Sequence, residues 1–180
     1  MIQHLSLLNP FVRIDDEATA RAAARGGAVA LLISAASMVF GILYVLASPE
    51  TMTSAMEAGM ANAAATDPEA AKMAEAMVPA LVNISMMFNG VLALMMVVLA
   101  VIQWRKMTKI IPLIFLMLCA LGALSMVWAL AMVATGMAPQ VPVPPLQAWV
   151  GRITLLLQVL LFITAFRGGS YLARAATPAA

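Results

Sequence analysis

The chain has 180 residues, of which 64% are hydrophobic and only 10% are charged, and its formal net charge is +2. Soluble domains carry about 25% charged residues, so this composition excludes a soluble globular domain and indicates an integral membrane protein. The basic residues divide among short segments beside apolar stretches, which is typical of topology signals in membrane proteins. We therefore expect the chain to lie in a lipid bilayer and to bind no nucleic acid.

Residues 1–27 are expected to stay on the protein, because their first apolar stretch is short and acidic residues follow it without a cleavage site. Within this segment, Asp15 to Arg25 predicts a short helix with acids at its start and arginines at its end, an order that suits the helix dipole. The pair Gly26-Gly27 is predicted to end that helix. The first span then covers residues 28–47, just long enough to cross a hydrocarbon core of about 30 Å.

Residues 48–79 contain two similar helix starts, Ser48-Pro49-Glu50 and Asp67-Pro68-Glu69. Each start places a capping side chain before a proline and an acid. Too few strongly apolar residues lie between the two starts for a span. We therefore expect an extracytoplasmic helical hairpin whose second arm continues from Pro68 into the second span, as far as Trp104.

The second half of the chain repeats the alternation of apolar spans and short connections. Proline at the first turn of the third span is compatible with a helix start. The predicted segments are the second span at 80–104, a basic cytoplasmic loop at 105–109, the third span at 110–134, a Pro-rich extracytoplasmic loop at 135–145, the fourth span at 146–166 and a cytoplasmic tail at 167–180.

The distribution of basic residues predicts the orientation of the chain. Eight arginines and lysines fall on the side of the two termini, whereas only Lys72 and Arg152 fall on the other side. By the positive-inside rule, both termini are expected in the cytoplasm. The predicted fold class is all-α, an integral membrane four-helix bundle with an extracytoplasmic helical hairpin, and the expected location is a bacterial inner membrane.

The second and fourth spans carry more polar side chains than the other two. The i,i+4 spacing places Ser85 with Asn89 on one helix face, and Thr154 with Gln158 on another. An unpaired amide near mid-bilayer is costly, so we expect the two faces to meet and to hydrogen-bond across the bundle. Their role is either contact between helices or binding of a ligand, a lipid or an ion. The candidate intramembrane polar site comprises Asn83, Ser85, Asn89, Arg152, Thr154 and Gln158.

Small residues in the first and third spans are candidate helix-packing positions. Ser37 with Gly41, and Ser125 with Ala129, each form a pair of small residues four apart, which lets another helix approach closely in lipid. The pairs also align in a faint internal repeat of the two spans. That repeat reflects either duplication or the bias of the chain toward alanine, leucine and methionine.

Sixteen methionines are the other unusual feature of the composition. Those of the hairpin recur at four-residue intervals on one helical stripe. Thioethers form adaptable apolar faces that dock on other proteins or on lipid, and they are also ligands for Cu(I). The candidate outer interaction face comprises Met52, Met56, Met60, Met73 and Met77.

The usual catalytic arrangements are missing from the sequence. His4 is the single histidine, and there is no CxxC or HExxH pattern and no glycine-rich phosphate loop. A membrane-buried haem usually takes an axial histidine, so neither haem nor any other cofactor is expected. The spans contain no carboxylate, which disfavours transport driven by a buried acid. We expect a protein without enzyme activity.

Three functions from different classes fit these features. The first is a structural or accessory membrane subunit that assembles with itself or with a larger membrane complex. The second is a small oligomeric transporter or channel whose path is lined by asparagine, glutamine and arginine side chains. The third is an extracytoplasmic sensor or binder of a hydrophobic ligand or of Cu(I), with the hairpin as its site.

Overall fold

The computed structural model describes residue 11 and residues 13–50, 68–136 and 145–176. Within these ranges the long regular elements are four helices: α2 (Glu17–Ala47), α4 (Pro68–Lys106), α5 (Ile110–Ala134) and α6 (Pro145–Ala175). Each helix is long and apolar enough to cross a membrane. The predicted all-α fold with four membrane-spanning helices is therefore confirmed, and the chain is an integral membrane protein.

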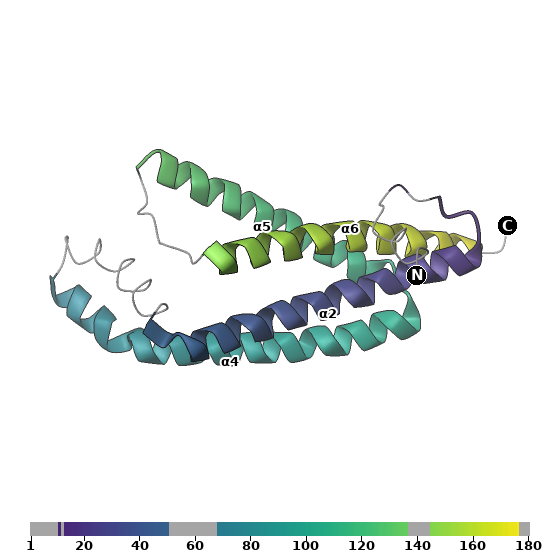
Figure 1. Ribbon diagram of the computed structural model, residues 1–180. Helices are drawn as coiled ribbons and strands as arrows, with labels where there is room; N and C mark the ends of the chain where they lie inside the picture. Colours follow the sequence, from purple (N-terminus) through teal and green to yellow (C-terminus); the bar gives the residue numbers. More distant parts are fainter. Residues whose placement is uncertain (1–10, 12, 51–67, 137–144, 177–180) are drawn as a thin grey trace.

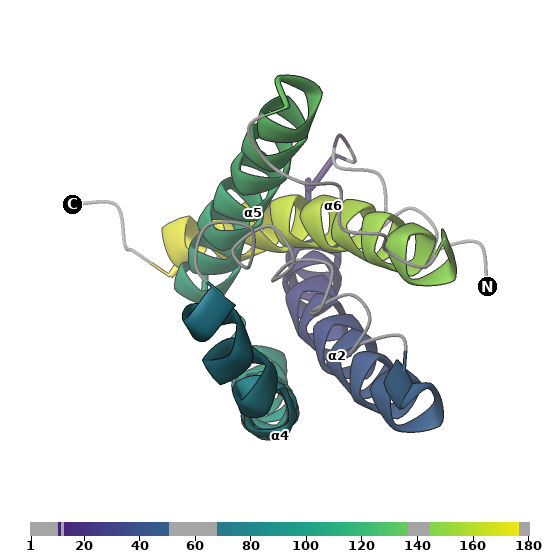
Figure 2. The ribbon, with the colours of Figure 1, turned by 90° about the vertical axis from the view of Figure 1, so that its left-hand side faces the viewer.

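The helices run alternately in opposite directions, so the start of α2, the end of α6 and the connection between α4 and α5 lie at one end of the molecule (Figure 1). We name this the terminal end and the opposite one the distal end. The central helix is α2, which packs along α4 and along α6, while α5 packs against α6. Viewed from the distal end, the four helices spread apart (Figure 2). Close packing is therefore concentrated toward the terminal end.

Small residues allow α2 and α6 to approach each other closely at the terminal end. Ala20, Ala23 and Ala24 of α2 are fully buried. A Cβ added at Gly168 of α6 would lie 2.6 Å from the carbonyl oxygen of Ala20 and 2.7 Å from the backbone nitrogen of Ala24, so only glycine fits there. Because lipid is as apolar as the helix faces, this close contact supplies the van der Waals attraction that holds the helices together.

Larger side chains fill the next layer toward the distal end. Leu31 of α2 and Phe162 of α6 are fully buried. The ring of Phe115 on α5 stacks on Phe162 with the centroids 5.5 Å apart, and Met96 and Ala100 of α4 close the same cluster. This layer is where all four helices contribute to one core.

The prediction that Gly26-Gly27 ends a short first helix is wrong. The helix α2 runs through both glycines without a break, so the amino-terminal helix and the first span are one element of 31 residues. A Cβ at Gly27 would lie 3.0 Å from the Cβ of Ala165 and 3.3 Å from the Cγ of Pro112. The glycine pair therefore serves contact between helices, which overrides its low helix propensity.

The last helix extends beyond the predicted fourth span at residues 146–166. Helix α6 continues to Ala175, through the second glycine pair, Gly168-Gly169. A Cβ at Gly169 would lie 3.0 Å from the backbone nitrogen of Lys109. This pair again marks a close approach, here to α2 and to the connection between α4 and α5.

The start of α2 is capped as the acids before it suggest. Asp16 is the N-cap residue, and its carboxylate accepts a hydrogen bond from the backbone N–H of Thr19 at 2.6 Å. This bond and one from the Thr19 hydroxyl hold the pKa of Asp16 below its ordinary value. The hydroxyl of Tyr171 on α6 donates to the carbonyl oxygen of Asp15 at 3.2 Å, so the segment before α2 is tied to the end of α6.

Only the second arm of the predicted hairpin is described. Residues 51–67, which contain most of the first predicted arm, lie outside the described residues. Helix α4 begins at Pro68 and continues past Pro79, so the second arm and the second span form one helix of 39 residues. At 1.5 Å per residue this helix is about 58 Å long, well beyond the thickness of a bilayer core.

The close approach of α2 and α6 predicts that Gly168→Ala destabilises the chain. A matched change, Gly151→Ala in the same helix, adds a Cβ that meets nothing within 4 Å. Both changes gain about 1 kcal/mol of helix propensity, but only the first overpacks against backbone, at a cost of about 1–3 kcal/mol or more.

The midpoint of thermal unfolding in detergent, followed by circular dichroism, measures the difference. We expect the midpoint to fall for Gly168→Ala and to stay level or rise for Gly151→Ala. Equal midpoints for the two variants would contradict a glycine-dependent contact between α2 and α6.

Candidate functional site

A cleft of about 280 Å³ opens between the distal halves of α2 and α4 and the start of α6. We name it the distal cleft. None of its side chains is charged, and two of the six residues of the predicted polar site, Ser85 and Asn89, contribute to it. The distal cleft is lined by Ser37, Met38, Gly41, Ile42, Val45, Ser85, Met86, Asn89 and Gln147.

The predicted meeting of the Asn89 face with the Gln158 face is wrong. The amide nitrogen of Gln158 donates instead to the hydroxyl of Ser34 on α2, at 2.9 Å. The amide nitrogen of Asn89 donates to the carbonyl oxygen of Ser85 in its own helix, also at 2.9 Å. The reason is topological, because α4 and α6 both pack on α2 and make little contact with each other. The bond of Gln158 thus links α6 to α2, whereas the bond of Asn89 stays within α4 and links it to no other helix.

The other residues of the predicted polar site lie apart from these. Asn83 of α4 and Arg152 of α6 are exposed, and Thr154 is half-buried. The guanidinium of Arg152 lies over the ring of Trp149, 5.5 Å from its centroid, an arrangement that suits a cation near the membrane interface. The six predicted residues therefore do not form one site.

The serine and threonine hydroxyls of the spans are not all satisfied within the chain. Ser34, Ser125 and Thr164 each donate to a carbonyl oxygen three or four residues earlier in the same helix. Ser37 and Ser85 make no side-chain hydrogen bond among the described residues. In lipid, where no water satisfies a hydroxyl, such groups favour a polar partner from outside the chain.

The predicted packing pairs do not mark close contacts within the chain. A Cβ at Gly41 would meet nothing within 4 Å, since α2 has separated from α6 at this depth, and Ser37 lines the distal cleft. Ser125 and Ala129 of α5 are exposed. Close approach occurs at Gly27, Gly168 and Gly169 instead, so a packing role for the predicted pairs remains a prediction about contacts between chains.

The methionine face is described only at Met77, which is 52% exposed on α4. Met52, Met56 and Met60 lie outside the described residues, as does the side chain of Met73. Among the residues that the structure describes, no three His, Cys, Asp or Glu side chains gather as metal ligands. Binding of Cu(I) by the hairpin therefore stays a prediction.

A buried glutamine at the terminal end is a polar contact that the sequence reasoning missed. The amide nitrogen of Gln103 donates to the carbonyl oxygens of Ala24 on α2, at 3.0 Å, and of Thr108, at 3.1 Å. Its amide oxygen accepts from the Thr108 hydroxyl at 3.3 Å. The available signal was a glutamine at the last turn of an apolar span, where the chain must turn sharply. Met107 makes that turn in the left-handed region, at φ 49°.

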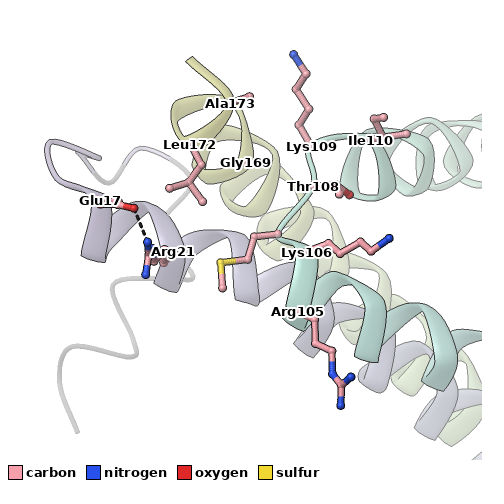
Figure 3. Close-up of a pocket in the computed structure, with 11 residues that line it drawn as sticks. Glu17, Arg21, Arg105, Lys106, Thr108, Lys109, Ile110, Gly169, Leu172 and Ala173 are labelled. Atoms are coloured by element: carbon pink, nitrogen blue, oxygen red, sulfur yellow. Dashed lines mark hydrogen bonds and ion pairs between the residues drawn. The ribbon is translucent and has the colours of Figure 1, made fainter. Parts of the chain in front are cut away.

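The same end of the molecule carries a second hollow, which we name the basic groove (Figure 3). It has a volume of about 640 Å³ and lies between the start of α2, the connection from α4 to α5 and the last turns of α6. Figure 3 shows the side chains of Lys106, at the end of α4, and of Lys109 projecting in different directions. The basic groove is lined by Glu17, Arg21, Arg105, Lys106, Met107, Thr108, Lys109, Ile110, Gly169, Leu172 and Ala173.

The hydrogen bonds of Gln158 and Asn89 predict unequal losses of stability on substitution. Gln158→Leu removes a bond between α6 and α2 and should lower stability by about 0.6 kcal/mol, and by no more than about 2 kcal/mol. Asn89→Leu removes only a bond within α4 and should change stability little. Both variants replace an amide with an apolar side chain of similar size.

The two variants are compared by chemical or thermal unfolding in the same detergent. A larger loss for Asn89→Leu than for Gln158→Leu would show that Asn89, and not Gln158, holds the helices together.

Comparison with protein-family models, with curated proteins and with solved structures gives no match to this chain. The function must therefore be argued from the helices, the distal cleft and the basic groove themselves. Among the described residues, Gln103 of α4 and Gln158 of α6 each donate a hydrogen bond to α2, whereas most other side-chain hydrogen bonds stay within one helix.

Proposed function

We propose that the chain is a non-catalytic structural or accessory membrane subunit that assembles with itself or with a larger membrane complex. It would lie in a bacterial inner membrane with the terminal end in the cytoplasm, because the basic residues beside α2, α4, α5 and α6 cluster at that end. The observation that carries the proposal is the isolation of α5 from the other helices over most of its length.

Helix α5 is held in the bundle only near its start. Pro112 is its one buried residue, and Phe115 makes its ring contact with α6. From residue 120 to residue 131 every side chain is exposed. An apolar helix is stable in lipid by itself, so exposure alone does not indicate a partner. The exposed part of α5, however, also carries a face of small residues.

Three small residues of α5 share one exposed face. Gly122, Ser125 and Ala129 follow each other at intervals of three and four residues, which places them on one side of the helix. A Cβ at Gly122 would meet nothing within 4 Å. Small residues in membrane helices are enriched where another helix packs closely, so this face supports contact with a helix from another chain.

Cysteine cross-linking in native membranes tests this contact. In a Cys119→Ala background, Ser125→Cys should cross-link through α5. Val127→Cys is the matched control, since Val127 is 63% exposed and lies on the opposite side of the helix by 100° per residue.

The products are read on a denaturing gel. A product of twice the chain mass indicates a second copy, and a product of another mass indicates a different partner. Cross-linking of neither variant, or of both equally, would argue against a specific partner on this face.

A second candidate function is binding of a neutral, membrane-soluble ligand in the distal cleft. The observation that favours it is the pair of hydroxyls, Ser37 and Ser85, that make no side-chain hydrogen bond among the described residues. The lining contains no charge, so a hydroxyl, carbonyl or amide of the ligand is the fitting partner. A transport path has less support, because Asn83 and Arg152 lie outside the distal cleft.

The ligand-binding candidate is tested with the variant Ser37→Ala/Ser85→Ala. Mass spectrometry of compounds that co-purify with the full chain in mild detergent should show a neutral species that this variant loses. Ser125→Ala, which changes an exposed hydroxyl of α5, should retain it. If the same compounds accompany all three proteins, the distal cleft does not bind them.

A further inference from the structure

The charge of the basic groove is strongly unbalanced. Four basic side chains and one acid line it, which gives a net charge of +3. The single acid, Glu17, is paired with Arg21 four residues along α2. Arg105, Lys106 and Lys109 make no ion pair among the described residues. Three cations within five residues of chain therefore lack a counter-charge in the protein.

The start of α5 adds a second, independent feature of an anion site. Its N-cap residue is Lys109, which makes no side-chain capping bond, and the first turn contains no acid. The N–H groups of Ile110 and Ile111 donate no hydrogen bond among the described residues. The first N–H groups of a helix have no partner within the helix and carry the positive end of the helix dipole. They therefore favour an anion at the start of the helix.

The basic groove lies where the helices leave the membrane. Helix α4 ends with Arg105 and Lys106, and the apolar helix α5 begins at Ile110, so the groove stands at the level of the lipid headgroups. Apolar side chains of Met107, Ile110 and Leu172 line it beside the cations. A headgroup phosphate with an attached glycerol and acyl chains matches this combination, whereas a free anion would use only the charge.

We propose that the basic groove is a binding site for the phosphate of an anionic membrane lipid, held by Lys106, Lys109 and the amino-terminal N–H groups of α5. Basic pockets between membrane helices recognise anionic headgroups in this way. Figure 3 shows that the two lysines project in different directions. Because both side chains are long and flexible, each has the reach to turn toward a phosphate at the start of α5. The proposal does not depend on the assembly of α5.

The test uses the full chain, purified in mild detergent and titrated with one lipid at a time. Native mass spectrometry counts bound phosphatidylglycerol, and phosphatidylcholine with the same acyl chains serves as the zwitterionic probe. We expect the anionic lipid to bind at least about tenfold more tightly than the zwitterionic lipid. Each cation near an anionic lipid contributes about 1 kcal/mol, so the two lysines together correspond to about thirtyfold, and tenfold is the lower bound.

Two variants separate a site from general surface charge. Lys106→Gln/Lys109→Gln removes two charges from the groove, whereas Arg13→Gln/Arg174→Gln removes two charges elsewhere at the terminal end. We expect the first variant to lose about thirtyfold in affinity for phosphatidylglycerol and the second to keep it. Circular dichroism and thermal unfolding confirm that both variants are folded, and the comparison of the two lipids on the unaltered chain stands without any variant.

Three results would overturn the proposal. If both lipids bind equally, the protein takes only a general lipid shell. If both variants lose the same affinity, the effect is surface charge and not a site. If inorganic phosphate at millimolar concentration displaces phosphatidylglycerol, the groove is a site for a free anion and not for a lipid.

Discussion

The contact on which the structure depends is the backbone approach of α2 and α6 at the terminal end. Gly168 has no room for a side chain against Ala20 and Ala24, and Gly27 meets Ala165 and Pro112 in the next layer. In lipid the hydrophobic effect does not draw helices together, so close packing of small residues has to do so. With α2 and α6 joined here, the other two helices are positioned by their packing, α4 against α2 and α5 against α6.

Polar side chains reinforce the same end of the molecule. Gln103 is fully buried, yet its hydrogen bonds reach α2 and the connection to α5. Arg25 lies over the ring of Trp104, 5.2 Å from its centroid. Toward the middle of the spans Gln158 bonds to Ser34. Because an unpaired amide in hydrocarbon is costly, these bonds select one register of the helices in addition to holding them.

The sequence predicts the four spans well, because length and lack of charge alone decide what lies in a bilayer. It predicts the site poorly. Periodicity identifies which residues share a face, but spans that are apolar on nearly all sides do not reveal which helix each face meets. For this reason the predicted pairing of Asn89 with Gln158 is wrong. The pair Gly26-Gly27 predicts a helix end because glycine both ends helices and permits close contact, and only the position of a neighbouring helix separates the two roles.

The unequal packing of the two ends separates two kinds of interaction with the surroundings. At the terminal end the helices pack closely and hydrogen-bond to one another. Among the described residues, the groups without a partner there include the positive charges of Lys106 and Lys109 and the start of α5. Toward the distal end the lining of the distal cleft carries no charge, and the small-residue face of α5 meets no other helix of the described chain. Unpaired cations attract anionic lipid headgroups, and faces of small residues allow another membrane helix to pack closely. A lipid at one end and a protein partner toward the other would thus act on different parts of the molecule, and the close contact of α2 with α6 lies beside the lipid and away from the partner.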